Sequence, residues 1–155
     1  MSLNEYVKKR KRDKKGTTEP KGKINKTNNK KNHFTYVIQR HWASHLHNDL
    51  RLEFDGVLKS WAIPKDPLLT LKGKKLLAVE VEDHPLDYAT FEGSIPEEQY
   101  GAGKVKIWDN GTFELIDKKP KKIIFNIKGK KLKGSYVLVK FKPPKNWLFF
   151  KKKED

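Results

Sequence analysis

The chain has 155 residues, a net charge of +16 and no cysteine. This length fits one domain, or one domain with a tail, and allows a sizeable core. The lack of cysteine excludes disulfides, thiolate metal ligands and cysteine nucleophiles. We find no run of about 18 apolar residues and no apolar signal region at the N-terminus, so we expect no membrane span and no secretion.

The excess of positive charge indicates a polyanionic partner. Nucleic acid is favoured over a membrane surface, because the sequence shows no basic amphipathic helix. Residues 1–32 carry twelve lysines and arginines, three acidic residues and few apolar ones. This composition predicts a basic arm that is poorly ordered when free. The arm is either a solvated tail or a nucleic-acid contact that orders on binding.

Residues 33–155 are expected to form the folded domain. Apolar and polar residues alternate over short stretches, and no segment of ten or more residues has a helical period. Strands are predicted at Phe34–Gln39, His47–Leu58, Val57–Ile63, Leu76–Glu82, Lys104–Trp108, Thr112–Ile116, Ile123–Lys128, Ser135–Phe141 and Trp147–Lys151, with a short element at Tyr88–Glu92. This pattern is typical of an all-β fold, a compact closed or partly closed β-barrel of about eight strands.

The turn signals divide this domain. Asp55-Gly56 is interpreted as a bend in a long strand, and Asp109-Asn110-Gly111 as the turn of a hairpin. Residues Leu69–Lys75 are expected to turn around Gly73, and Gly93–Gly103 to form a loop. A second hairpin is predicted around Gly129–Gly134. The eleven lysines from Lys118 to Lys145, with no acidic residue among them, serve either solubility or a nucleic-acid groove.

The strand that begins at His47 carries the strongest functional signal. Side chains alternate along a strand, so His47, Asp49 and Arg51 share one face, while the leucines and the phenylalanine between and after them face the other way. At a rise of about 3.3 Å per residue, the three polar groups stand about 7 Å apart. An imidazole, a carboxylate and a guanidinium in a row suit a metal ion and a bound oxyanion. The competing interpretation is the solvent face of an ordinary strand.

His41 and His84 extend this candidate site. Two imidazoles and a carboxylate suit Mn²⁺, Fe²⁺ or Zn²⁺ better than Mg²⁺ or Ca²⁺, and three protein ligands leave open positions for water and substrate. Tyr88, Lys65 and Gln39 are candidates for the same cavity, although an isolated tyrosine or lysine is more often structural or solvated.

One alternative for these residues is an iron oxygenase. His47-x-Asp49 with the distant His84 has the spacing of the iron triad in 2-oxoglutarate oxygenases, which are also all-β. Those enzymes need a basic residue about ten positions after the distal histidine to hold the co-substrate. The segment Thr90–Glu98 contains no lysine or arginine, which disfavours this interpretation.

Longer motifs surround the candidate residues. They are His41-x5-His47-x-Asp49-Leu50-Arg51-Leu52-Glu53, Gly56–Lys65, Val81–Tyr88, Phe91–Pro96, Tyr100–Gly103 and Trp108–Thr112. In this order they resemble the 3′-phosphoesterase domain of bacterial and archaeal DNA ligase D. The resemblance covers nearly the whole chain, from about Tyr6 to Lys151, and includes Arg12-Asp13 and Thr18-Glu19-Pro20 in the arm.

The resemblance implies a β-barrel enzyme that removes a 3′-terminal ribonucleoside and then a 3′-phosphate, with Mn²⁺ preferred and Co²⁺ or Zn²⁺ as alternatives. By position it implies the metal ligands His41, Asp49 and His84, with a loop bringing His41 over the sheet. It implies that His47, Arg51 and Tyr88 engage the scissile phosphate, with Gln39 and Lys65 in support, and that Arg12, Asp13 and Glu19 serve the ribonucleoside step. His47 or Tyr88 would protonate the leaving oxygen. An arginine that the family often carries is Leu76 here, and its basic neighbour Lys75 would face the other way.

The implied partners are DNA primer-templates with 3′-ribonucleotide or 3′-phosphate ends, together with a separate ligase, a polymerase and Ku-like proteins of end-joining repair. We expect a standalone monomer that is cytoplasmic and associated with the nucleoid. The alternative from another class is a non-catalytic basic barrel that binds DNA ends. Such a binder would not need His41, Asp49, Arg51 and His84 together.

Overall fold

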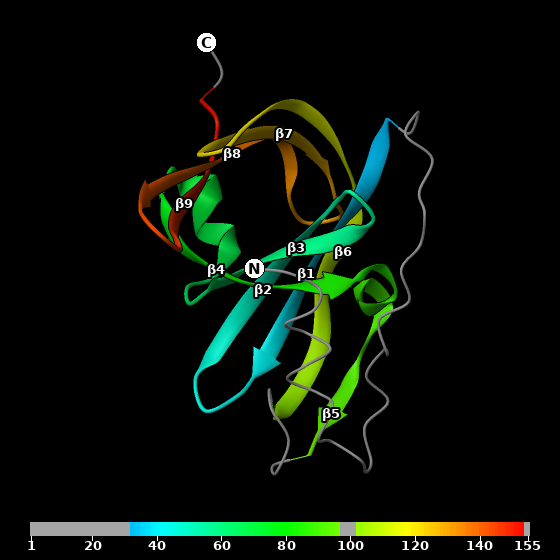
Figure 1. Cartoon of the computed structure of the whole chain (residues 1–155). Helices are drawn as coiled ribbons and strands as arrows, with labels where there is room; N and C mark the ends of the chain where they lie inside the picture. The colour runs from blue at the N-terminus through cyan, green and yellow to red at the C-terminus, as the bar shows by residue number, and fades with distance from the viewer. Residues whose placement is uncertain (1–31, 97–101, 154–155) are drawn as a thin grey trace.

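The computed structural model describes residues 32–96 and 102–153, and the predicted arm lies outside them except for its last residue, Asn32 (Figure 1). These residues form nine strands and two 3-10 helices. The strands are β1 (His33–Trp42), β2 (Leu46–Phe54), β3 (Val57–Ile63), β4 (Leu76–Pro85), β5 (Gly93–Ile95), β6 (Gly103–Lys119), β7 (Lys122–Lys128), β8 (Lys133–Lys142) and β9 (Asn146–Lys151). The 3-10 helices are η1 (Pro67–Lys72) and η2 (Leu86–Thr90).

Eight of these strands close into an antiparallel barrel, in the order β1-β2-β3-β4-β9-β8-β7-β6, with β6 pairing back to β1. The short β5 pairs with the first residues of β6. The predicted all-β barrel is therefore confirmed. None of the helices in the described part of the chain is long and apolar enough to cross a membrane.

Inward-facing aromatic and branched side chains fill the barrel. Tyr36, Trp61, Phe113 and Phe149 are almost completely buried in this core. The helix η1 packs against β4 and β9, and its Thr70 hydroxyl lies 2.9 Å from the Tyr136 hydroxyl inside the core. The alternation of apolar residues seen in the sequence thus marks the inner face of each strand.

A second apolar cluster lies on the outside of the barrel. The segment made of η2 and β5 places Tyr88, Phe91 and Ile95 against Val37 and Val105 of the barrel wall. Figure 1 shows η2 and β5 to one side of the strands β1 and β6. This segment forms one wall of a cavity on the outer surface, so the polar faces of β1 to β4 are not simply exposed to solvent.

The structure differs from the sequence-based predictions at two turns. The hairpin predicted at Asp109-Asn110-Gly111 is wrong, because β6 runs through it as one strand that pairs with both β1 and β7. The sharp turn lies instead at Asp55 and Gly56, whose φ angles are 52° and 83°. Two consecutive left-handed residues give the tight turn that joins β2 to β3 as a hairpin. The interpretation of Asp55-Gly56 as a bend in one long strand is therefore also wrong.

Gly111 serves a close approach between neighbouring strands rather than a turn. A Cβ atom at this position would collide with the backbone carbonyl of Lys128. Asp109, two residues earlier, accepts hydrogen bonds from the backbone N–H groups of Lys130 and Lys131. The Asp-Asn-Gly signal therefore comes from contacts with the loop between β7 and β8.

The strand β1 is longer than predicted. It continues past Gln39 to Trp42, so His41 lies on a strand and pairs directly with His47 across the β1–β2 ladder. The loop expected to carry His41 over the sheet is limited to residues 43–45. Leu76, at the position of the family's arginine, is buried in the core, and the Lys75 ammonium lies 4.7 Å from the Phe150 ring centroid.

Candidate active site

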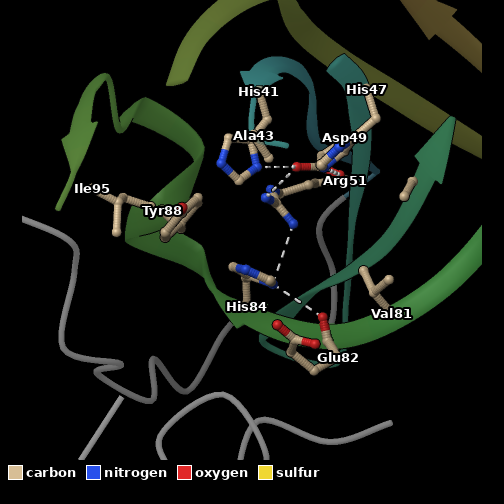
Figure 2. A pocket seen from close by; sticks show the side chains of 11 residues that line it. His41, Ala43, His47, Asp49, Arg51, Val81, Glu82, His84, Tyr88 and Ile95 are labelled. Atoms are coloured by element: carbon tan, nitrogen blue, oxygen red, sulfur yellow. Dashed lines mark hydrogen bonds and ion pairs between the residues drawn. The ribbon is translucent and has the colours of Figure 1, made fainter. Parts of the chain in front are cut away.

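Four adjacent strands bring the predicted residues together on the outer face of the barrel. The register pairs are His41 with His47 and Gln39 with Asp49 between β1 and β2, Arg51 with Ser60 between β2 and β3, and Leu58 with His84 between β3 and β4. The period-two prediction for β2 is confirmed, since Leu50, Leu52 and Phe54 lie in the core. Figure 2 shows His41, Asp49, Arg51 and His84 gathered in one cavity, with Tyr88 and Ile95 beside it.

The cavity has a volume of about 350 Å³. It is lined by His41, Ala43, His47, Asp49, Arg51, Ala62, Val81, Glu82, His84, Tyr88 and Ile95. Polar groups from β1, β2 and β4 thus face apolar side chains of the η2–β5 segment. A concave site of this kind, with a few convergent polar groups, is the usual form of a small-ligand site.

Asp49 stands at the centre of the cluster and is 6% exposed. Its Oδ1 atom lies 3.2 Å from Nε2 of His47. Its Oδ2 atom lies 3.8 Å from Nδ1 of His41 and 3.3 Å from Nη2 of Arg51. Burial opposes ionisation of this carboxyl, but Arg51, His47 and His41 together outweigh burial and lower its pKa. The structure therefore favours a carboxylate here.

The contact with Asp49 shifts the pKa of His47 upward, opposite to the shift of the Asp49 pKa. Its hydrogen bond to Asp49 raises the pKa of its imidazole, and burial opposes this effect only in part. Its Nδ1 atom lies 3.1 Å from the carbonyl oxygen of His45, and its ring meets the His41 ring edge-on at 4.9 Å between centroids. Without a metal, the Asp49–His47 contact favours a protonated imidazole, and metal binding would release that proton.

Arg51 is 3% exposed and is held from several sides. Its Nε donates to Oε1 of Gln39 at 2.6 Å, and its Nη1 donates to Oγ of Ser60 at 2.9 Å. Nη1 also lies 3.2 Å from Nδ1 of His84, and the guanidinium carbon lies 4.8 Å from the Tyr88 ring centroid. The guanidinium is therefore fixed before any ligand arrives, as suits the binding of a phosphoryl group.

Gln39 lies behind the cavity rather than in it. It is fully buried, and its Nε2 donates to the carbonyl oxygens of Tyr88 and Phe91 at 2.8 and 3.1 Å. Since its Oε1 accepts from Arg51, Gln39 connects the guanidinium to the segment that covers the site. Its predicted contact with the phosphate stays a prediction.

Two other residues sit differently from the sequence-based interpretation. Lys65 does not line this cavity but a separate one of about 600 Å³, together with Leu69, Lys75 and Leu77, so its role at the phosphate also stays a prediction. Ser60, which was not singled out, lies 3.5 Å from Nδ1 of His84 as well as bonding Arg51. Its signal was its place across from Arg51 in the ladder, which a sequence alone does not show. Arg12, Asp13 and Glu19 lie outside the described residues.

Within the described residues, His41, His47 and Asp49 form a group that could hold a metal ion. One possible ligand atom from each lies within 4.8 Å of the others. His84, the third ligand implied by the resemblance, is not part of this group, and Arg51 contacts both His84 and Asp49 (Figure 2). This geometry favours His47 as the neighbour of His41 and Asp49.

The fold and the cavity define a β-barrel with a histidine–carboxylate group beside a buried arginine. Residues 39–140 match the family described as the DNA ligase D 3′-phosphoesterase domain, and every described residue of the cavity falls in this range. The chain therefore belongs to the DNA ligase D 3′-phosphoesterase domain family.

The chain is also similar to larger curated proteins. It is 47% identical over 144 residues to the multifunctional non-homologous end joining protein LigD of Pseudomonas aeruginosa. The aligned region covers 89% of this chain and 16% of that protein. The LigD proteins of Mycobacterium tuberculosis and Mycolicibacterium smegmatis are 49% and 44% identical, over 68% and 92% of this chain and 14% and 20% of their own lengths. The chain thus spans a fifth or less of the length of these relatives.

Proposed function

We propose that this protein is a metal-dependent phosphoesterase that processes DNA 3′ ends in repair by end joining. The substrates would be 3′-terminal ribonucleosides and 3′-phosphates on primer-templates, with Mn²⁺ as the metal and Co²⁺ or Zn²⁺ as alternatives. The proposal rests on one observation above all. A buried, pre-positioned arginine contacts the carboxylate of a His–Asp–His group inside one open cavity.

The donor set suits the proposed metal. Two imidazole nitrogens and a carboxylate oxygen are ligands that first-row divalent ions accept, and an all-oxygen shell for Mg²⁺ or Ca²⁺ is absent from this group of described residues. We therefore propose His41, His47 and Asp49 as the ligands. When bound, a divalent ion would polarise a phosphoryl oxygen and lower the pKa of a bound water.

The other cavity residues would bind and orient the phosphate. Arg51 offers a fixed planar donor to the phosphoryl oxygens, and Gln39 and Ser60 keep it in place without competing for the substrate. The Tyr88 ring packs against both Arg51 and His84, whose ring centroid is 4.7 Å away. Tyr88 therefore aligns these two side chains along the wall where the phosphate would lie.

The rest of the surface supports a DNA substrate. The lysines that the sequence concentrates between Lys118 and Lys145 supply long-range attraction to a polyanion. We propose that these lysines contribute to binding DNA and that the cavity performs the chemistry. The proposed role of Arg12, Asp13 and Glu19 in the ribonucleoside step concerns residues outside the described ranges.

The test is release of inorganic phosphate from a primer-template with a 3′-phosphate, measured with and without Mn²⁺. Asp49→Asn keeps the size of the side chain but removes the charged ligand. We expect it to lower the metal-dependent rate more than about a hundredfold, since even indirect supports of a metal are worth about 10–100-fold. DNA affinity in a gel-shift or anisotropy assay should change little.

The matched control is Asp117→Asn, which alters a half-exposed carboxylate far along β6 that lies 3.8 Å from the Lys119 ammonium. It should leave the rate unchanged. Wild-type protein that binds DNA but releases no phosphate with any of the three metals would support the non-catalytic binder instead.

A further inference from the structure

The tip of the β1–β2 hairpin exposes an apolar pair beside the cavity. Trp42 and Leu46 are direct register partners at the end of the ladder. Their exposed fractions are 42% and 48%, which place them among the exposed large hydrophobic residues of the described chain. A single exposed apolar residue is ordinary, but a tryptophan and a leucine facing each other at a hairpin tip form a small continuous platform.

This platform is one residue step away from the proposed metal ligands. The preceding register pair is His41 with His47, whose side chains face Asp49. Because successive side chains point to opposite faces, the histidines face the cavity and the Trp42–Leu46 pair faces the other side of the same hairpin. Ala43, in the three-residue tip between the strands, lines the cavity. The tip therefore separates the platform from the cavity.

Positive charge lies next to the platform. Lys104 of β6 pairs with Trp42 across the β1–β6 ladder, and its ammonium lies 5.8 Å from the Trp42 ring centroid. Two residues further along the same strands, Arg40 pairs with Lys106. Lys106 adds a second ammonium on this face, while the Arg40 guanidinium lies 4.0 Å from the Asp66 carboxylate. An exposed aromatic ring beside cations is the combination that proteins use to stack a nucleobase and hold its phosphate.

We propose that Trp42 and Leu46 form an end-stacking platform for the last base pair of a DNA duplex whose 3′ end enters the cavity. The proposal rests on the proposed function. The last pair stacks on the Trp42 ring and the Leu46 side chain, Lys104 neutralises a neighbouring phosphate, and the 3′-terminal group passes over residues 43–45 to Arg51. The platform thereby sets which phosphate reaches the cavity and favours a paired end.

A DNA end is the occupant that fits best. Lys104 and Lys106 beside the platform attract a polyanion, and the cavity on the other face of the hairpin suits a phosphoryl group. A base pair also matches the flat shape of an indole, and stacking tolerates any base sequence.

The direct test uses the metal-free full-length protein with its four tryptophans replaced by 5-fluorotryptophan. The ¹⁹F resonance of Trp42 is assigned from its loss in Trp42→Phe. A blunt duplex with a 3′-phosphate should shift this resonance through the ring current of the stacked bases. The buried Trp61 and Trp147, at 1% and 4% exposure, serve as internal controls and should not move. A Trp42 resonance that stays in place at saturating duplex would overturn the proposal.

The kinetic test compares two substrates. Trp42→Ala should lower kcat/KM about tenfold on the duplex 3′-phosphate, as expected for loss of one stacking contact, and should leave kcat/KM on a single-stranded 3′-phosphate unchanged. Trp42→Phe should restore most of the duplex rate. Phe141→Ala, which truncates another half-exposed aromatic residue on β8, is the matched control.

Equal losses of kcat/KM on the duplex and on the single strand would contradict the stacking platform but not the proposed phosphoesterase activity. Absence of any phosphate release by the wild type would instead contradict the proposed function, whatever the ¹⁹F spectrum shows. The two failures are therefore distinguishable.

Discussion

Two buried aspartates flank the strand β1 at nearly the same level. Asp49 on β2 pairs with Gln39, and Asp109 on β6 pairs with the neighbouring residue Ile38. They are 6% and 3% exposed. Asp49 faces the outer cavity, whereas Asp109 faces the barrel core and the loop between β7 and β8.

Their partners differ in kind. Asp109 accepts hydrogen bonds from the Tyr36 hydroxyl at 2.7 Å and from the backbone N–H groups of Lys130, Lys131 and Leu132 at 2.8–3.0 Å. In the described part of the chain, Asp49 is in contact with the ionisable side chains of His41, His47 and Arg51 in the cavity, at 3.2–3.8 Å. Backbone donors cannot leave or titrate, while imidazoles and water can be exchanged for a ligand. Burial alone therefore does not identify a functional carboxylate. The chemistry of the groups that contact it distinguishes Asp49 from Asp109.

The largest expected effect concerns stability and should separate the two positions. Asp109→Asn should destabilise the protein by about 3 kcal/mol. Both carboxylate oxygens of Asp109 accept hydrogen bonds, so the amide nitrogen of asparagine would replace one acceptor and point at groups that can only donate. Asp49→Asn should cost less than about 1 kcal/mol, since a neutral histidine can accept from the amide. Urea denaturation of both variants at one pH measures the difference. Equal losses of stability would erase the distinction drawn here.

The second prediction sharpens the account of Asp49. If His41, His47 and Asp49 hold the metal, His47→Ala should weaken Mn²⁺ binding about a hundredfold, whereas His84→Ala should weaken it by less than about tenfold. The reason is that Arg51 lies between His84 and Asp49. Mn²⁺ titration followed by electron paramagnetic resonance gives both affinities. The reverse order would favour the ligand set implied by the resemblance, with His84 in place of His47.

Much of the fold was predictable, because alternation marks strands directly. The two Asp-Gly signals were not, because each has the same local meaning and only the tertiary structure decides between them. At Asp55-Gly56 the chain turns with two left-handed residues. At Asp109-Asn110-Gly111 the side chain of Asp109 is used by a distant loop, and β1 and β7 hold β6 straight.

The candidate site was predictable along one strand but not between strands. Alternation placed His47, Asp49 and Arg51 on one face of β2. It could not show that Gln39 and Ser60 clamp Arg51, because those contacts depend on the register of β1 and β3 against β2. It also could not show that His41 faces His47 across a ladder, since the length of β1 is set by its pairing with β6 as far as Trp42.

The smallest expected effect is a change in one titration. Asp49 raises the pKa of His47, so in the metal-free protein this imidazole should titrate above its ordinary value of about 6.5. Its contribution to stability is then complete below that value and is lost as the pH rises through the raised pKa. Asp49→Asn removes the largest cause of the shift, so the pKa of His47 should fall and this pH dependence should shrink.

The donors around Asp109 should show no such change between about pH 6 and about pH 9, a range that spans the ordinary histidine value of about 6.5 and ends below the ordinary tyrosine value of about 10. Three of these donors are backbone N–H groups, which do not titrate. The fourth is the Tyr36 hydroxyl, whose pKa is raised well above its ordinary value by burial and by the bond to Asp109. Imidazole proton resonances followed by NMR across this range measure the His47 titration in both proteins. An unchanged His47 pKa in Asp49→Asn would show that the contact at 3.2 Å does not control the proton, and the contrast between an exchangeable and a fixed carboxylate would lose its electrostatic basis.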